Sequence, residues 1–217
     1  MSTQLDHLVI VAADLNSGVE YVAENLGVSI PKGGEHPAMG THNHLMQLGS
    51  GAYLEVIAIN PQGSPPSTPR WYDMDNPLLR YRLKHGPFLA HWVVNVADYA
   101  DLPGFGTELW GKPRPMSRGD LRWLISVPED GRLPGGGLLP TVIQWQNEHP
   151  ASNMHDSGCR LLEMELRHPQ PGWLLQKLNG IQAEHISNIP VRVTTDPVAG
   201  FSVRIRTPSG ESRLDSF

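Results

Sequence analysis

Four polar side chains occupy matching places in two strand-rich blocks of the sequence. His7 is the third residue of LDHLVIV, and His91 is the third residue of LAHWVVN. Near the end of each block, Glu55 lies inside YLEVI and Gln144 lies inside VIQWQ. Two imidazoles, a carboxylate and an amide form a donor set that suits Zn, Fe(II), Mn or Ni. The pattern therefore predicts a divalent metal site formed by His7, Glu55, His91 and Gln144.

Glu55 is the strongest member of this set, because burying an unpaired carboxylate inside an apolar strand is costly. Other interpretations stay open. Glu55 could pair with a nearby Arg or His, or face solvent on a half-exposed strand. Gln144 equally suits a hydrogen-bonded position in the core. A single histidine on a buried strand is more often a core or pocket residue than a metal ligand, so the argument depends on the matched pairs.

The elements that must position these residues begin with a block over residues 1–60. Residues 5–11 form an apolar run typical of a buried strand. Residues 17–27 carry apolar side chains at helical spacing. A short strand at 28–30 and a loop at 31–40 are expected next, followed by the strand-like runs 41–49 and 52–59 around a glycine turn. The expected order is strand, helix, strand, strand, strand.

A Pro-rich connection over residues 61–87 leads to a second block over 88–146, which partly repeats the first and indicates an internal duplication. Its expected elements are strands at 88–96, 121–128 and 139–146, with an irregular edge strand in 107–116. Residues 147–217 then predict a partial third βαββ unit packed on the others. Its expected elements are a strand at 159–169, a helix at 172–180 and strands at 189–195 and 201–207.

Further side chains are candidates for holding a substrate. His42 and His44 alternate with Thr41 and Asn43, so they share one strand face, which predicts either a binding role or a solvated face. Trp92 and Trp123 belong to second-block strands and suit either the core or the wall of a pocket for a planar or apolar ligand. His36 lies in a glycine-rich loop that could close over the site.

Composition narrows the function classes. The chain has 217 residues and a formal net charge of −5, and its basic residues are scattered, which argues against nucleic-acid binding. No apolar run reaches the roughly 20 residues that span a membrane. The single cysteine, Cys159, and a start without signal-peptide features predict a cytoplasmic protein. Glycine-rich nucleotide motifs and a serine-nucleophile elbow are absent from the sequence.

The two-block pattern resembles the vicinal oxygen chelate superfamily, which includes glyoxalase I and the extradiol dioxygenases. The stretches LDHLVI, GTHNHL, YLEVIAINP, LAHWVV and VIQW are similar to its glyoxalase-like domain family over roughly residues 5 to 146. The resemblance implies an α+β fold of paired βαβββ modules whose curved mixed sheets form a concave site. It also implies metal ligands on the first and last strands of each module, at His7, Glu55, His91 and Gln144.

By the same resemblance, the expected function is a metal-dependent lyase or isomerase acting on a small oxygenated organic substrate, with Glu55 as the catalytic base. Two alternatives stay open: a metal-free protein that binds or sequesters a small molecule, and an Fe(II)-dependent ring-cleaving dioxygenase. Both modules are present, so we expect a complete site within one chain. Because modules of this kind also pair between chains, a homodimer stays open.

Overall fold

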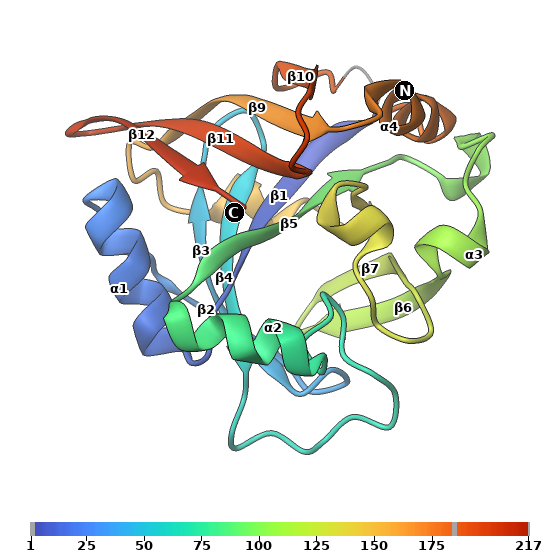
Figure 1. Cartoon of the computed structure of the whole chain (residues 1–217). Coiled ribbons are helices and arrows are strands. Elements are labelled where there is room, and N and C mark those ends of the chain that lie inside the picture. The colour runs from blue at the N-terminus through green and yellow to red at the C-terminus, as the bar shows by residue number, and fades with distance from the viewer. Residues whose placement is uncertain (1–2, 184–185, 217) are drawn as a thin grey trace.

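The computed structural model describes residues 3–183 and 186–216. Over these residues the strands form an eight-stranded sheet A, in the order β2-β3-β4-β1-β5-β8-β7-β6, and a four-stranded sheet B, in the order β10-β9-β11-β12. Sheet A is curved, and sheet B lies across it (Figure 1). The fold is α+β and consists of paired glyoxalase-like modules, as the sequence predicted. None of the helices in these residues is long and apolar enough to cross a membrane.

The first module forms one half of sheet A. Its apolar first strand pairs with β4 in parallel and with β5 in antiparallel orientation, and it is buried at every residue after Gln4. A strand that is buried on both faces explains the unbroken apolar run. The elements are β1 (Gln4–Val11), α1 (Leu15–Leu26), β2 (Lys32–His36), β3 (Thr41–Gln47) and β4 (Tyr53–Ile59).

Helix α1 is defined at both ends by local chemistry. The Asp14 side chain accepts a hydrogen bond from the Ser17 amide, and Gly27 ends the helix in the left-handed conformation with φ 67°. Gly18 faces β4 so closely that an added Cβ would lie 2.3 Å from a methyl carbon of Val56. The helix therefore covers the convex face of sheet A at close range.

The second module forms the other half of sheet A. It repeats the pairing of the first, because β5 and β8 are parallel neighbours, as β1 and β4 are. The antiparallel junction of β1 with β5 relates the two halves by an approximate twofold axis. The elements are β5 (Phe88–Asn95), a 3-10 turn (Tyr99–Asp101), α3 (Thr107–Trp110), β6 (Lys112–Arg118), β7 (Leu121–Val127), a turn at Pro134–Gly137 and β8 (Thr141–Trp145).

Residues 150–216 pack sheet B against the convex face of sheet A. Phe201, Val203 and Met164 belong to the same apolar core as Leu8 and Trp92. The elements are a turn at Pro150–Asn153, β9 (Arg160–His168), α4 (Pro171–Gly180), β10 (Val191–Thr195), β11 (Gly200–Thr207) and β12 (Gly210–Asp215). Strand β12 extends the predicted βαββ order by one strand, which its polar sequence GESRLD did not indicate.

Two other details differ from the sequence-based prediction. The second strand of the first module lies at residues 32–36, inside the predicted loop, and not at 28–30. The Pro-rich connection contains α2 (Pro77–Arg82), which Asn76 caps and Pro77 starts, and a following 3-10 turn (Leu83–His85). Both misses have one cause: β2 reads KGGEH and α2 is a six-residue helix, so neither carries a clear apolar period.

Candidate active site

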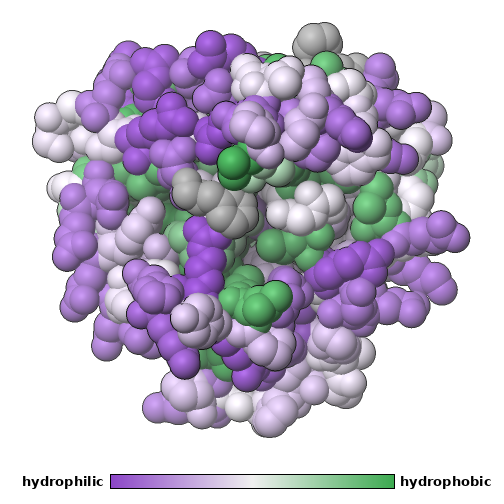
Figure 2. Space-filling model, viewed as in Figure 1, coloured by the Kyte–Doolittle hydropathy of each residue, from purple (hydrophilic) through white to green (hydrophobic). Residues whose placement is uncertain are grey.

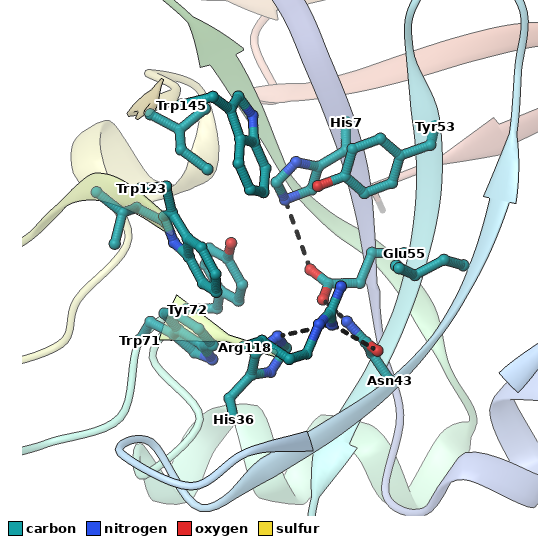
Figure 3. Close-up of a pocket in the computed structure, with 13 residues that line it drawn as sticks. His7, His36, Asn43, Tyr53, Glu55, Trp71, Tyr72, Arg118, Trp123 and Trp145 are labelled. Atoms are coloured by element: carbon teal, nitrogen blue, oxygen red, sulfur yellow. Dashed lines mark hydrogen bonds and ion pairs between the residues drawn. The ribbon is translucent and has the colours of Figure 1, made fainter. Parts of the chain in front are cut away.

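The concave face of sheet A carries a pocket that both modules build. Its empty volume is about 370 Å³, part of which is open to solvent, so it suits a small ligand. Strands β1 to β4, the connection before α2, and strands β6 to β8 supply its walls (Figure 3). Its lining residues are His7, His36, Asn43, Leu45, Tyr53, Glu55, Trp71, Tyr72, Arg118, Trp123, Ile125, Ile143 and Trp145.

His7 is held from behind by a buried carboxylate. Asp6 Oδ1 lies 2.6 Å from His7 Nδ1, and Asp6 Oδ2 accepts from Trp145 Nε1 at 2.7 Å and lies 2.9 Å from His149 Nε2. Burial alone raises the pKa of Asp6, but the hydrogen bonds from His149 and His7 outweigh it and hold that pKa well below its ordinary value. An ionised Asp6 favours the tautomer of His7 that carries its proton on Nδ1. Because Nδ1 contacts Asp6, Nε2 is the nitrogen that faces the pocket.

A β-bulge allows two consecutive residues to meet in this way. The pairing of β1 with β5 shifts register between Leu5 and His7, which leaves Asp6 as the extra residue. Side chains of consecutive residues in a regular strand point to opposite faces, and a bulge breaks that alternation. The irregularity therefore brings the Asp6 carboxylate beside the His7 ring.

Glu55 faces His7 across the pocket floor. Its Oε2 lies 3.5 Å from His7 Nε2, and its Oε1 accepts from Asn43 Nδ2 at 2.6 Å. The orientation of the Asn43 amide is fixed by its other end, because Oδ1 accepts from the Gly34 backbone amide at 2.8 Å and a backbone N–H can only donate. Glu55 is only 5% exposed, so one amide donor and one imidazole dominate its surroundings.

Arg118 enters the pocket from the second module. Its Nη1 lies 3.4 Å from His36 Nε2 and 3.4 Å from Asn43 Oδ1 (Figure 3). His36 Nδ1 lies 3.1 Å from Thr41 Oγ1. Burial, and then the positive charge of Arg118, lower the pKa of His36 to about 3. A neutral His36 accepts a hydrogen bond from the guanidinium group and does not repel its positive charge, so it holds Arg118 over the site.

Aromatic rings form most of the remaining wall. Tyr53 stacks on His7 with ring centroids 4.6 Å apart, and Trp71 stacks on Tyr72 at 5.5 Å. Trp123 and Trp145 lie 5.2 Å apart. Burial, together with the carboxylates of Asp6 and Glu55, raises the pKa of Tyr53 and the pKa of Tyr72 well above the ordinary value for tyrosine. The pocket thus combines a polar floor with planar, largely apolar walls.

The strand register corrects the prediction for the second module. Val9 pairs with Glu55 in the first module, and Val93 pairs with Thr141 in the second. Thr141, three residues before Gln144, is therefore the structural counterpart of Glu55. The contact between His7 and Glu55 has its equivalent in the second module, where His91 Nε2 lies 3.0 Å from Thr141 Oγ1.

His91 and Gln144 consequently do not join His7 and Glu55. His91 Nε2 also accepts from the Thr141 backbone amide at 3.1 Å, so its lone pair is occupied, and burial lowers the pKa of His91 to about 3. Gln144 lies between Ile143 and Trp145, which both line the pocket, so it faces the opposite side of β8. There its Oε1 accepts from the Tyr99 amide at 3.4 Å.

The expected four-ligand metal site is therefore not assembled. Of its members, only His7 and Glu55 line the pocket. Catalytic zinc sites use three protein ligands, and no group of three or more His, Cys, Asp or Glu side chains in residues 3–183 and 186–216 is arranged to hold a metal ion. These residues do not fit the predicted metal centre, since the matching place in the second module carries a threonine.

The predicted substrate-binding residues divide in the same way. Trp123 lines the pocket. His42 and His44 lie on the other face of β3, where His44 Nδ1 lies 2.8 Å from the Ile30 carbonyl, and Asn43 between them points inward. Trp92 is fully buried in the core between the two sheets and donates to the Leu138 carbonyl. The alternation predicted for β3 is present in the structure, but the sequence left open which of its faces is concave.

Sequence analysis missed Asp6, Asn43 and Arg118. Asp6 was overlooked because a bulge cannot be predicted from an apolar run. Asn43 could have been found, because it alternates with the two histidines of THNH and belongs to the other face. Arg118 ends an edge strand that carries two prolines, and only the curvature of sheet A brings it to the first module.

Two βαβββ modules that share one curved sheet and line one concave pocket define a protein of the vicinal oxygen chelate type. The family model of a glyoxalase-like domain matches residues 5–181, and the chain belongs to that family. No curated protein matches the sequence.

Solved structures resemble this chain in fold. A hypothetical protein from Staphylococcus aureus shares 12% identity with a TM-score of 0.59, and the alignment covers 92% of this chain and 88% of that one. Methylmalonyl-CoA epimerase from Mycobacterium tuberculosis shares 20% identity with a TM-score of 0.39, covering 65% of this chain and 86% of that one.

Proposed function

We propose that this protein is an isomerase or lyase that moves a proton on a small oxygenated organic substrate, with Glu55 as the base and His7 as its acid partner. The observation that carries the proposal is the buried contact of 3.5 Å between Glu55 Oε2 and His7 Nε2. Asp6 holds His7 from outside the pocket, Asn43 holds Glu55, and both side chains face the interior. A fixed acid–base pair in a shielded pocket is what proton transfer at carbon requires.

Glu55 is suited to remove a proton from a carbon next to a carbonyl group. Asn43 occupies Oε1, so Oε2 is the oxygen available to the substrate. The electron pair of the broken C–H bond would move to the carbonyl oxygen and form an enolate. The aromatic walls exclude water, which strengthens the electrostatic stabilisation of that charge.

His7 is suited to return a proton to the enolate, because the proton that Glu55 takes up can pass to His7 Nε2 across the 3.5 Å contact before it reaches the carbon. Asp6 holds the proton on Nδ1, so Nε2 can gain and release a second proton on the pocket side. Proton return to the opposite face of the same carbon, or to a different atom of the enolate, gives an isomerase, and loss of a leaving group from the enolate gives a lyase. Both outcomes use the same first step.

The proposal includes no step through a metal ion, because His91 and Gln144 lie away from Glu55. A ring-cleaving dioxygenase needs two histidines and one carboxylate at one Fe(II) ion, and the contacts of His91 with Thr141 do not favour that role. A protein that only binds a small molecule is the second candidate, favoured by the narrow aromatic pocket. Exchange kinetics separate it from an enzyme.

The test is solvent exchange at carbon. We would incubate the protein in D₂O with 2-oxobutanoate or with the neutral hydroxyketone acetoin and follow loss of the C–H signals by proton NMR. We expect wild-type protein to accelerate exchange in at least one compound. Glu55→Gln should lower the rate by about 100-fold or more, since it removes the base and keeps the shape. Glu35→Gln, on the exposed face of neighbouring β2, should leave the rate unchanged.

Two results would overturn the proposal. Exchange no faster than in buffer would favour the binding protein, and exchange that survives Glu55→Gln would exclude Glu55 as the base. Metal analysis and EDTA treatment complete the experiment. We expect the rate to persist after EDTA, and parallel loss of exchange and of stoichiometric metal would contradict a mechanism carried by Glu55 and His7 alone.

A further inference from the structure

Arg118 is a cation of the pocket that has no carboxylate partner among the described residues. Its hydrogen bonds go to His36 and Asn43, both uncharged in this arrangement. Several other arginines of the chain pair with acids, as Arg70 does with Asp75 at 2.6 Å. A half-buried guanidinium without a counter-charge gains most from an anionic ligand, and its planar fork matches a carboxylate.

The position of Arg118 depends on a close approach between the two edge strands of sheet A. Strands β2 and β6 lie at opposite edges of sheet A, and the curvature of the sheet brings them together. Gly34 on β2 lacks the side chain that would block the approach, because an added Cβ would lie 2.8 Å from Arg118 Cδ. The guanidinium therefore reaches the first module over a glycine.

Arg118 and Glu55 contact opposite ends of one amide group. Asn43 accepts from Arg118 through Oδ1 and donates to Glu55 through Nδ2. An anion on the guanidinium would place the next one or two atoms of its chain near the Glu55 carboxylate. This spacing suits a carboxylate group separated by one or two bonds from the carbon that exchanges its proton.

A second unsatisfied group lies in the same pocket. Trp71 is 4% exposed, lines the pocket, and its buried Nε1–H has no hydrogen-bond partner among the described residues. Buried donors of this kind are normally satisfied, so an unpaired one indicates an acceptor that the ligand supplies. The neighbouring rings of Tyr72 and Trp123 favour a flat ligand.

We infer that the pocket selects small, planar carboxylates, whose carboxylate group binds Arg118 and whose reactive carbon faces Glu55. This inference rests on the proposed function for the role of Glu55, and it adds the chemical class of the substrate. His36 is a positioning residue, which acts through Arg118.

The test compares two probes of the same size and different charge. Pyruvate and its neutral amide, pyruvamide, would be titrated into the full-length protein, with tryptophan fluorescence and ligand-observed NMR as readouts. We expect wild-type protein to bind pyruvate about tenfold or more tightly than pyruvamide. Arg118→Gln should abolish this preference. Arg114→Gln, on the same strand and outside the pocket, should retain it, and Arg118→Lys should retain part of it.

Each outcome decides one of the two ideas. Equal binding of pyruvate and pyruvamide to wild-type protein, no binding of either, or a preference that survives Arg118→Gln would overturn the inference, whatever the exchange assay gives. A preference that depends on Arg118, in a protein without exchange activity, would support the inference and overturn the proposed enzyme. Thermal unfolding and circular dichroism of each variant verify that it is folded.

Discussion

At the scale of single residues, the site depends on two buried carboxylates that differ in their hydrogen-bond partners. Asp6 receives three hydrogen-bonding contacts from ring nitrogens and serves as a fixed anion. Glu55 receives one from Asn43 and keeps an oxygen facing the pocket. The first arrangement stabilises charge permanently, and the second leaves an oxygen free to take up a proton. This difference favours a structural role for Asp6 and supports the proposed role of Glu55 as the base.

Replacing Asp6 should cost stability in a pH-dependent way. Asp6→Asn supplies one acceptor oxygen for three ring donors, so we expect a loss of about 3 kcal/mol at pH 7. The pKa of Asp6 is lower in the folded than in the unfolded chain, so its stabilisation is complete above the ordinary aspartate pKa of about 4 and is lost as the pH falls below it. Urea denaturation at several pH values would measure this.

The control for that experiment is Asp120→Asn, in an exposed turn between β6 and β7. The difference between wild type and Asp6→Asn should narrow below pH 4, over the range in which both remain folded. An Asp6→Asn protein as stable at pH 7 as the Asp120→Asn protein would show that the buried network contributes little.

At the scale of elements, the site is made by departures from regular strands. The bulge in β1 brings Asp6 beside His7, and the glycines of β2 let β6 approach. The outer edges of sheet A would otherwise stay apart, since the two modules contact each other mainly along β1 and β5. A short, glycine-rich edge strand and a Pro-containing edge strand therefore complete the pocket, although each is a poor strand by composition.

Gly34→Ala tests the contact of β2 with β6. The new methyl group would displace Arg118 from Asn43 and His36, so we expect pyruvate to bind several-fold more weakly. Stability should change by less than about 1 kcal/mol, since alanine suits a strand better than glycine does. Gly106→Ala, where an added Cβ meets no atom within 4 Å, is the control. Fluorescence titration and urea denaturation give the two readouts, and unchanged pyruvate binding would contradict the assigned position of Arg118.

At the scale of the whole molecule, the two modules place equivalent histidines in different surroundings, one in the pocket and one in the core. His7 meets Glu55 in an accessible pocket, and His91 meets Thr141 in a core position that is 0% exposed. A neutral threonine cannot balance a protonated imidazole, so the second position is structural. Two neutral buried histidines, His36 and His91, then shape the response of the whole fold to acid.

Stability should fall steeply between pH 6.5 and about 3. The pKa of His36 and that of His91 are lowered to about 3 in the folded chain, mainly by burial. Below pH 6.5 the unfolded chain binds protons that the folded chain excludes, so each histidine removes about 1.4 kcal/mol of stability per pH unit. Replacing His91 by Gln, which keeps an acceptor for the Thr141 amide, should remove one such contribution. Denaturation midpoints from pH 4 to 7 would measure the slope.

The exposed His85 offers the matched control for that measurement. His85→Gln should leave the pH slope unchanged. An identical slope in wild type, His91→Gln and His85→Gln would show that His91 takes up protons equally in both states.

The sequence by itself determined the duplicated α+β modules and the positions of His7 and Glu55 on buried strands. Apolar period, glycine turns and repeated strand sequences are local properties, so they can be read along the chain. The tertiary structure alone decided the membership of the site. Register made Thr141, and not Gln144, the counterpart of Glu55 in the second module, a bulge placed Asp6 beside His7, and sheet curvature brought Arg118 to the pocket. These choices depend on the energies of strand pairing and closure between distant segments, which no local pattern of residues records.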